Sequence, residues 1–505
     1  MRFNKILKGK NKTINHEGAE AWKMTPEMEL YTAVVTSTLS KSFYEGEANR
    51  VARIRGLINK VDPEFIAQLA IYAREKMHLR SIPLVLTVEL AKVWSGDDLV
   101  YRLTKRVIQR ADEITELLAY YQLANGRNGQ KKLARLSKQL QKGIAAAFHK
   151  FDEYQFAKYN RKTEVSLKDA LFLTHPKPES EAEQILFNKI VSDELAVPYT
   201  WEVELSRLGQ QTFKNERQKK AAVRNKWQEL IDSGRLGYMA LLRNLRNILQ
   251  ADVRTDYLKI VAKRLKNPEE VRRSRQLPFR FLSAYLELEA MKHVHASYFL
   301  RPLEKAALVS VENLKGFDLD TKVCLAADVS GSMFGPISPR SKIQAYDIGL
   351  LLSMLLRARS KAVITGIFGD RWEAFQFPTS SVLSNVARLK KIEGRVGYAT
   401  NGHKVIDDLL RKRIVMDKVM MFTDLQMWSS HGVGNSLKKS WQAYKKLAPG
   451  ARLYLFDLRG YGKSPISMER DDVASIAGWS DKVFEVLDAI EQGKNALDLI
   501  AQIDF

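Results

Sequence analysis

The stretch from residue 322 to residue 333, KVCLAADVSGSM, constrains the fold more than any other part of the chain. Its first half is an apolar run that predicts a buried strand. Asp328, Ser330 and Ser332 follow, which places one carboxylate and two hydroxyls at alternate positions. Hard cations such as Mg²⁺ prefer oxygen ligands of this kind. Because open parallel sheets bind ligands at the carboxyl ends of their strands, we expect a cation site here.

Two further oxygen-bearing residues lie downstream in suitable loops. Thr400 lies in a polar loop before an expected helix, and Asp424 ends a second apolar run that predicts a buried strand. Asp and Ser also cap turns and helices, so capping is the alternative interpretation. In this order the residues resemble the metal-ion-dependent adhesion site of a von Willebrand factor A-type domain. The resemblance implies Mg²⁺ or another divalent cation, held by Asp328, Ser330, Ser332, Thr400 and Asp424.

The chain from about residue 320 alternates expected strands with amphipathic stretches. This alternation predicts an α/β domain with a doubly wound, mostly parallel sheet. The stretches 343–357 and 438–447 are expected to be helices that cover the sheet. The expected strands are 323–327, 362–368, 372–377, 419–422 and 452–458, with 483–487 as a candidate final strand.

Residues from about 25 to 315 predict almost only helices. Asp62 and Pro63 predict a helix start, because aspartate caps the helix and proline fits its first turn. The segments 80–84 and 275–279 share an arginine, an aliphatic residue and a proline before an expected helix. Many short helices with irregular spacing favour an all-α solenoid of the HEAT type over a compact bundle.

The formal net charge of +23 at pH 7 lies mostly in this helical part. Such a bias favours a polyanionic partner, above all nucleic acid, although a basic surface without a partner would carry the same charge. The single cysteine, Cys324, excludes an intrachain disulfide and a cysteine-based zinc site. No apolar run is long enough to span a bilayer, and the basic N-terminus lacks the apolar region of a secretory signal. We therefore expect a cytoplasmic protein.

Positive side chains recur at helical spacing between residues 131 and 144. They share one helix face, while leucines and an isoleucine occupy another. Such a face would contact phosphates without reading sequence, although a solvated face of an amphipathic helix has the same pattern. Further cations and a histidine follow near Tyr159, whose ring could stack on an unpaired base. The candidate RNA-binding residues are Lys131, Arg135, Lys138, Lys142, Lys158, Lys162, His175 and Arg243.

Short segments spread over nearly the whole chain point to one family. They are NHEG at 15–18, TPEMEL at 25–30, KDAL at 168–171, ALLRNL at 240–245, LPF at 277–279, DVSGSM at 328–333 and FTD at 422–424. In this order they resemble the Ro autoantigen family, in which a TROVE module precedes a von Willebrand A-type domain. The resemblance implies a basic N-terminal arm (1–24), a HEAT-like RNA-binding domain (25–318) and the A-type domain (319–505).

The family resemblance also implies a ring. Helical repeats would curve into a monomeric toroid that the A-type domain closes. Y RNA would bind the outer basic surface, and single-stranded 3′ ends of misfolded or precursor RNA would enter the hole. Lys158 and His175 match basic positions of the Y RNA surface, and Lys162 matches one where some members carry arginine. The metal loops depart from relatives at Ala399 and at residues 425–426.

The leading interpretation is a non-enzymatic RNA-binding protein that assists RNA quality control, with a 3′→5′ exoribonuclease as a possible partner. The alternative is a Mg²⁺-dependent protein-interaction module without a specific RNA role. A metal-dependent nuclease is the weaker alternative, because hydrolysis needs a positioned base and the motifs place no histidine near the two aspartates.

Overall fold

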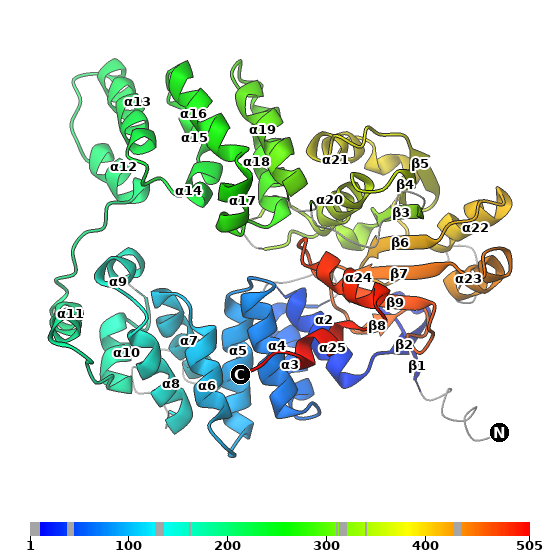
Figure 1. The fold of residues 1–505 in the computed structure, drawn as a ribbon, viewed down its shortest axis with the longest axis horizontal. Helices are drawn as coiled ribbons and strands as arrows, with labels where there is room; N and C mark the ends of the chain where they lie inside the picture. Colours follow the sequence, from blue (N-terminus) through cyan, green and yellow to red (C-terminus); the bar gives the residue numbers. More distant parts are fainter. Residues whose placement is uncertain are drawn as a thin grey trace. The chain divides into compact units, whose positions relative to one another are not determined.

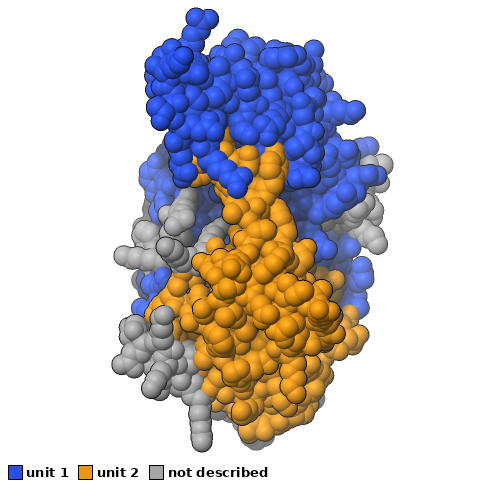
Figure 2. Space-filling model, turned by 90° about the vertical axis from the view of Figure 1, so that its left-hand side faces the viewer, with its two compact units in different colours: residues 1–50, 207–496 blue, residues 51–206, 497–505 orange. Residues whose placement is uncertain are grey.

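The structure of the protein is a computed structural model that describes residues 11–37, 45–126, 136–160, 163–309, 312, 321–338, 341–428 and 436–505. The chain divides into two compact units (Figure 2). Unit 1 comprises residues 1–50 and 207–496, and unit 2 comprises residues 51–206 and 497–505. The boundaries fall at α3 (Glu47–Ile58), α12 (Trp201–Gly209) and α25 (Ala496–Ala501).

Unit 2 consists of helices that pack on their close neighbours in the sequence (Figure 1). The predicted start of α4 is confirmed, since Pro63 is its first residue and the Asp62 carboxylate accepts a hydrogen bond from the Phe65 N–H at 3.3 Å. α4 packs on α5 and α6, α5 packs on α7, and α6 packs on α8. The helices are α4 (Pro63–Glu75), α5 (Ser81–Val93), α6 (Leu99–Val107), α7 (Ala111–Ala124), α8 (Lys138–Phe148), α9 (Glu153–Tyr159), α10 (Leu167–Thr174) and α11 (Glu181–Ser192).

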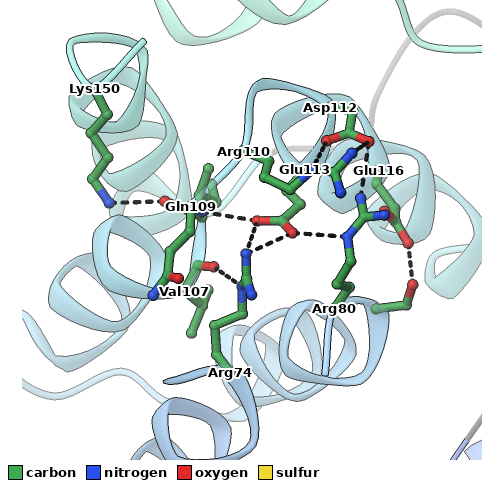
Figure 3. A network of polar contacts seen from close by, with 11 residues as sticks. Arg74, Arg80, Val107, Gln109, Arg110, Asp112, Glu113, Glu116 and Lys150 are labelled. Atoms are coloured by element: carbon green, nitrogen blue, oxygen red, sulfur yellow. Dashed lines mark hydrogen bonds and ion pairs between the residues drawn. The ribbon is translucent and has the colours of Figure 1, made fainter. Parts of the chain in front are cut away.

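An ionic network centred on the buried Arg74–Glu113 pair joins α4, α5 and α7 inside unit 2 (Figure 3). The Arg74 guanidinium donates to both carboxylate oxygens of Glu113, at 2.9 and 3.0 Å, and to the Val107 carbonyl at 3.0 Å. Arg80 adds a contact of 3.3 Å to Glu113 and one of 2.9 Å to Asp112. Because Glu113 is fully buried, its charge depends on these partners.

Unit 1 also contains a set of short helices. α18 and α19 pack together, and α16 and α17 pack on α19. The Glu304 carboxylate of α19 accepts hydrogen bonds from the N–H groups of residues 382–384 at 2.7–3.0 Å, which caps the start of α21 (Leu383–Lys390). The helices are α2 (Pro26–Val35), α13 (Glu216–Asp232), α14 (Tyr238–Arg243), α15 (Leu245–Gln250), α16 (Thr255–Leu265), α17 (Pro268–Ser274), α18 (Pro278–Met291) and α19 (Ser297–Val309).

A six-stranded sheet forms the rest of unit 1, in the order β5-β4-β3-β6-β7-β9 (Figure 1). Its strands run parallel except for the edge strand β5, which pairs antiparallel with β4. The mixed sheet beside a mostly helical chain confirms the predicted combination of an all-α part and an α/β part. The strands are β3 (Lys322–Asp328), β4 (Ala362–Phe368), β5 (Trp372–Phe375), β6 (Lys418–Thr423), β7 (Arg452–Asp457) and β9 (Val473–Ala477).

Helices cover both faces of this sheet. Cys324 and Met421 point to the face where α22 and α23 bury Leu409 and Trp441. α20 covers the opposite face, where Gly349 lies against Phe422. The covering elements are α20 (Ala345–Arg357), α21 (Leu383–Lys390), α22 (His403–Arg411), α23 (Ser436–Leu447) and α24 (Val483–Glu491), with the short 3₁₀ turns η1 (Gly331–Met333) and η2 (Glu393–Val396).

Two expectations about the sheet are wrong. Residues 483–487 belong to helix α24, because Val483, Phe484, Val486 and Leu487 form one buried helical face. The sixth strand is instead β9, which the sequence analysis did not predict. The third expected strand, 372–377, is confirmed but ends at Phe375.

The described part of the N-terminal arm forms a hairpin. β1 (Lys12–Ile14) pairs antiparallel with β2 (Glu20–Lys23), and β2 pairs with β8 (Lys463–Ser464). The arm therefore adds a small second sheet to unit 1. Among the described residues, no helix has the length and apolar character needed to cross a membrane.

Candidate metal site and cationic pocket

The two predicted metal-binding carboxylates lie at the same edge of the large sheet. Asp328 is the last residue of β3, and Asp424 directly follows β6. β3 and β6 are adjacent parallel strands, with Ala327 opposite Phe422. Counted within the sheet, the strand order is 3-2-1-4-5-6, and strands 1 and 4 flank the position where ligands bind in doubly wound folds.

The first loop folds back on the Asp328 carboxylate. One of its oxygens accepts a hydrogen bond from the Ser330 N–H at 2.8 Å, and the other accepts one from the Thr423 hydroxyl at 2.6 Å. The hydroxyl oxygens of Ser330 and Ser332 lie 3.3 Å apart. The loop therefore gathers several oxygen atoms at one point, as the motif predicts.

Backbone hydrogen bonds connect the first loop to the second and the second loop to the third. The Gly331 N–H donates to the Tyr398 carbonyl at 2.9 Å, and the Trp428 N–H donates to the Thr400 carbonyl at 3.4 Å. Asp424 accepts from the Gln426 N–H at 2.9 Å. The structure thus brings the three predicted loops together, and Asp328, Ser330, Ser332, Thr400 and Asp424 are all buried.

The two carboxylates are electrostatically poised for a cation. Burial raises the pKa of Asp328 to about 7, and the nearby charge of Asp424 contributes to this shift. Burial likewise raises the pKa of Asp424 above its usual range. One carboxylate oxygen of Asp424 is buried and has no hydrogen-bond partner among the residues that the structure describes. Buried carboxylates are costly unless a countercharge pairs with them, so this edge of the sheet fits a positive ion.

The ligand types fit a hard cation rather than zinc. Among the described residues, no group of three or more His, Cys, Asp or Glu side chains is placed to hold a metal. The site instead offers two carboxylates and three hydroxyls, oxygen ligands that suit Mg²⁺.

Sequence reasoning missed the residues that support the third loop. Leu425 adopts a left-handed backbone with a φ of 65°. The Gln426 side-chain oxygen accepts from the His16 N–H at 3.0 Å, and the Asn15 amide donates to the Met427 carbonyl at 2.8 Å. These contacts join segments more than 400 residues apart, so no local pattern could have revealed them.

A second candidate site is a pocket of about 930 Å³ in unit 2. It is formed by α6, α8 and the segment after α10. Asp98 and Glu179 also line it, but positive residues prevail. The basic lining consists of Lys105, Lys142, His149, Lys150, His175 and Lys177.

Close helix packing and helix ends position these side chains. Gly143 of α8 lies against Thr104 of α6 so closely that a Cβ at Gly143 would meet the Thr104 Cβ at 2.5 Å. His175 ends α10 in a left-handed conformation, with a φ of 49°. The Lys150 ammonium donates to the Ile108 carbonyl at 2.8 Å, and partial burial lowers the pKa of Lys150 to about 8.

The structure groups only some of the candidate RNA-binding residues. Lys142 and His175 line the pocket, and Lys138 is exposed one turn earlier on α8. Lys158 lies over the rings of Tyr154 and Tyr159, at 5.6 and 5.7 Å from their centroids. Arg243 is exposed on α14 in unit 1. Lys131, Arg135 and Lys162 lie outside the described residues.

Four basic pocket residues were not among the candidate RNA-binding residues: Lys105, His149, Lys150 and Lys177. Lys105 lies on α6, and His149 lies just after the end of α8, where its Nδ1 pairs with the Glu183 carboxylate at 2.6 Å. Each is an ordinary exposed or half-buried residue of its own segment. Only the packing of α6 against α8 brings Lys105 and His149 into the pocket.

The fold defines a class of protein in which a long helical region joins a doubly wound sheet that carries a buried two-carboxylate loop site. The TROVE domain model matches residues 33–204 and 193–316, more than half of the chain. The protein therefore belongs to the Ro family of RNA-binding proteins, which share the TROVE domain.

Known proteins agree with this assignment. The chain is 26% identical to telomerase protein component 1 of Rattus norvegicus over 330 residues, and to that of Mus musculus over 309 residues. These alignments cover 52% and 48% of this chain but only 12% of each relative, so the chain matches a small part of them. The crystal structure of the Deinococcus radiodurans Ro (RSR) protein has the same fold, with a TM-score of 0.60 and 17% identity. That match covers 93% of this chain and 100% of the other.

Proposed function

We propose that the protein is a non-enzymatic RNA-binding protein whose unit 2 holds a small structured RNA by its phosphates. The observation that carries this proposal is the pocket that gathers four lysines and two histidines. Lysine ammonium groups bind phosphates as point charges, and the affinity that they provide depends on salt but little on base sequence. The net charge of +23 supports the same class of ligand.

The pocket residues divide into exposed and fixed groups. Lys105, Lys142 and Lys177 are exposed, so they can reach a phosphate from different elements. Lys150 is already bound to the end of α6, and it contributes charge at a defined position. Tyr154 is exposed beside Lys158 and offers a ring on which an unpaired base can stack.

The family resemblance supports the finer part of the proposal. The structured RNA would be a Y RNA, and the helical repeats and the A-type domain would form a ring. The single-stranded 3′ end of a misfolded or precursor RNA would enter the hole of the ring, and a 3′→5′ exoribonuclease would process it in RNA quality control. A duplex end could not enter a narrow ring, so a hairpin with a single-stranded 3′ tail should bind more tightly than a blunt hairpin.

Fluorescence anisotropy with labelled RNA hairpins tests both parts. The combined Lys142→Ala and Lys177→Ala variant should weaken hairpin binding at least roughly tenfold, since each lost phosphate contact reduces affinity. The matched control is Lys60→Ala with Lys76→Ala, which removes two exposed lysines of unit 2 outside the pocket. If both variants lose the same hairpin affinity, the pocket lysines contribute no more to binding than other basic residues of the surface. A hairpin with a 3′ tail that binds no better than a blunt hairpin would contradict threading.

We also propose that the edge of the large sheet is the metal site of a von Willebrand A-type domain. The strand order supports this assignment, as does the buried Asp424 oxygen to which no described residue donates a hydrogen bond. Asp328, Ser330, Ser332, Thr400 and Asp424 would hold Mg²⁺. When bound, the ion would supply a positive centre that attracts a carboxylate from a protein partner.

Variants of the metal site separate this role from RNA binding. Asp328→Ala should abolish Mg²⁺-dependent capture of a protein partner and leave RNA affinity within twofold of wild type. Nucleotide release by metal-loaded protein, lost in Asp424→Ala, would support the nuclease alternative instead.

A further inference from the structure

Two arginines meet in unit 1 where α18 packs on both α14 and α15. The rings of Tyr238 in α14 and Phe281 in α18 lie 6.4 Å apart, centroid to centroid. Farther along α18, Glu287 pairs with Arg246 of α15 at 2.7 Å. The first arginine is Arg243, the last residue of α14, which lies in the chain between Tyr238 and Arg246. It therefore lies beside the early turns of α18, between these two contacts.

The second arginine, Arg280, lies on the face of α18 that carries Glu287. Residues seven apart share a helix face, and the pairing of Glu287 shows that this face is turned toward α15. Ser283 and Ala284 occupy the turn between them with short side chains. Partial burial lowers the pKa of Arg280, and the charge of Arg243 adds to this effect. The two guanidinium groups are therefore close enough to act on the same ligand.

These two arginines differ from their neighbour Arg246, which is neutralised by Glu287. In the described part of the chain, no acidic side chain pairs with Arg243 or Arg280, and both are exposed. Like charges held near each other repel, and a bound anion relieves this repulsion. Arg280 is also the third residue of α18, so the positive end of the helix dipole adds to the attraction for an anion.

We propose that Arg243 and Arg280 bind the phosphodiester backbone of an RNA strand, at a site in unit 1 formed without the pocket residues of unit 2. A guanidinium group can donate two parallel N–H groups to phosphate oxygens, so the pair can hold one phosphate or two successive ones. Such contacts position a strand without reading its bases. The net charge of +23 favours RNA over a small free anion. The inference rests on the proposed RNA-binding function and adds a second point of contact.

Fluorescence anisotropy of the full chain with a labelled oligouridylate, which forms no hairpin, tests the proposal. Arg243→Gln with Arg280→Gln removes both charges and should raise the Kd for this RNA about tenfold or more. The matched control is Arg217→Gln with Arg301→Gln, which removes the same charge from exposed positions on α13 and α19 of unit 1. The control variant should bind within twofold of wild type.

A charge-conserving variant tests whether the guanidinium groups themselves bind the phosphates. Arg243→Lys with Arg280→Lys keeps both charges but loses the planar pairs of N–H groups, so its Kd should stay at least about threefold above that of wild type. Recovery of the wild-type affinity would overturn the bidentate contacts.

Other outcomes would overturn the site as a whole. If the glutamine variant loses no more affinity than the control, Arg243 and Arg280 do not hold RNA. Displacement of the oligouridylate by millimolar inorganic phosphate at fixed ionic strength would indicate a site for a small anion instead. Hairpin binding that still depends on Lys142 and Lys177, beside no effect of the arginines, would contradict this inference alone. If wild type binds neither RNA, the proposed function fails, and this inference fails with it.

Discussion

Labelling of Cys324, the single cysteine of the chain, can show whether the large sheet is folded. It lies fully buried in the middle of β3, and burial raises the pKa of its thiol to about 12. Since the thiolate is the reactive form, we predict that a thiol reagent such as DTNB does not label native protein at pH 8. Labelling should follow the unfolding of unit 1 in urea. Rapid labelling of folded protein would contradict the buried position of β3.

Asp457 should make the stability of unit 1 depend on pH. One of its carboxylate oxygens accepts from the N–H groups of Arg459 and Gly460, and the other is buried with no hydrogen-bond partner in the described part of the chain. Burial raises the pKa of Asp457 to about 6, from an ordinary value near 4. Between these values the folded state holds a proton that the unfolded state releases, so the contribution of Asp457 to stability falls as pH rises from about 4 to 6.

Urea unfolding in EDTA at pH 4 to 6.5 measures this effect. In the wild-type protein, Asp457 should lower the free energy of unfolding by up to about 3 kcal/mol as the pH rises over this range. We expect the Asp457→Asn variant to lack this decrease. Asp256→Asn, at an exposed position in the same unit, should keep the wild-type profile. An unchanged profile in Asp457→Asn would mean that Asp457 does not hold a proton in this range.

At the scale of elements, the ion pair between Arg74 of α4 and Glu113 of α7 should be essential for the stability of unit 2. Glu113→Ala would leave the buried Arg74 guanidinium without its carboxylate, and breaking a buried pair in this way costs about 3–5 kcal/mol. The matched control is Asp98→Asn, which breaks the exposed Arg102–Asp98 pair and should cost less than about 1 kcal/mol. Chemical unfolding followed by circular dichroism gives both values, and similar costs would contradict the network of Figure 3.

The elements also show what the sequence could and could not predict. Local sequence patterns were enough to predict two kinds of element. These are long periodic helices such as α4 and α20, and the apolar strands β3, β6 and β7. The segment 483–487 was misassigned because a short apolar run fits a strand and a buried helix equally well. The meeting of the three loops of the proposed metal site was predictable, because chain order places their residues at one sheet edge. The support from Asn15 and the pocket roles of Lys105 and His149 depend on tertiary contacts, which leave no local signal.

At the scale of the whole molecule, RNA binding should be strongly dependent on salt. If Lys142 and Lys177 each contact a phosphate, the slope of log Kd against log salt concentration should be lower by roughly 1.5 in the double alanine variant than in wild type. The control with Lys60 and Lys76 replaced should keep the wild-type slope. Binding isotherms at 50 to 300 mM NaCl provide the slopes, and an unchanged slope in the pocket variant would show that these lysines do not bind phosphate.

The pairing of β2 with β8 has a consequence for how the protein is made. Unit 1 takes its hairpin from the start of the chain and its large sheet from residues beyond 320, with the whole of α4 to α11 translated between them. Unit 2 is synthesised later than the hairpin, yet most of its helices can assemble earlier, because their partners are close neighbours in the chain. On the ribosome, β1 and β2 must therefore wait until β8, more than 400 residues later in the chain, has been synthesised before the hairpin can take its place in unit 1.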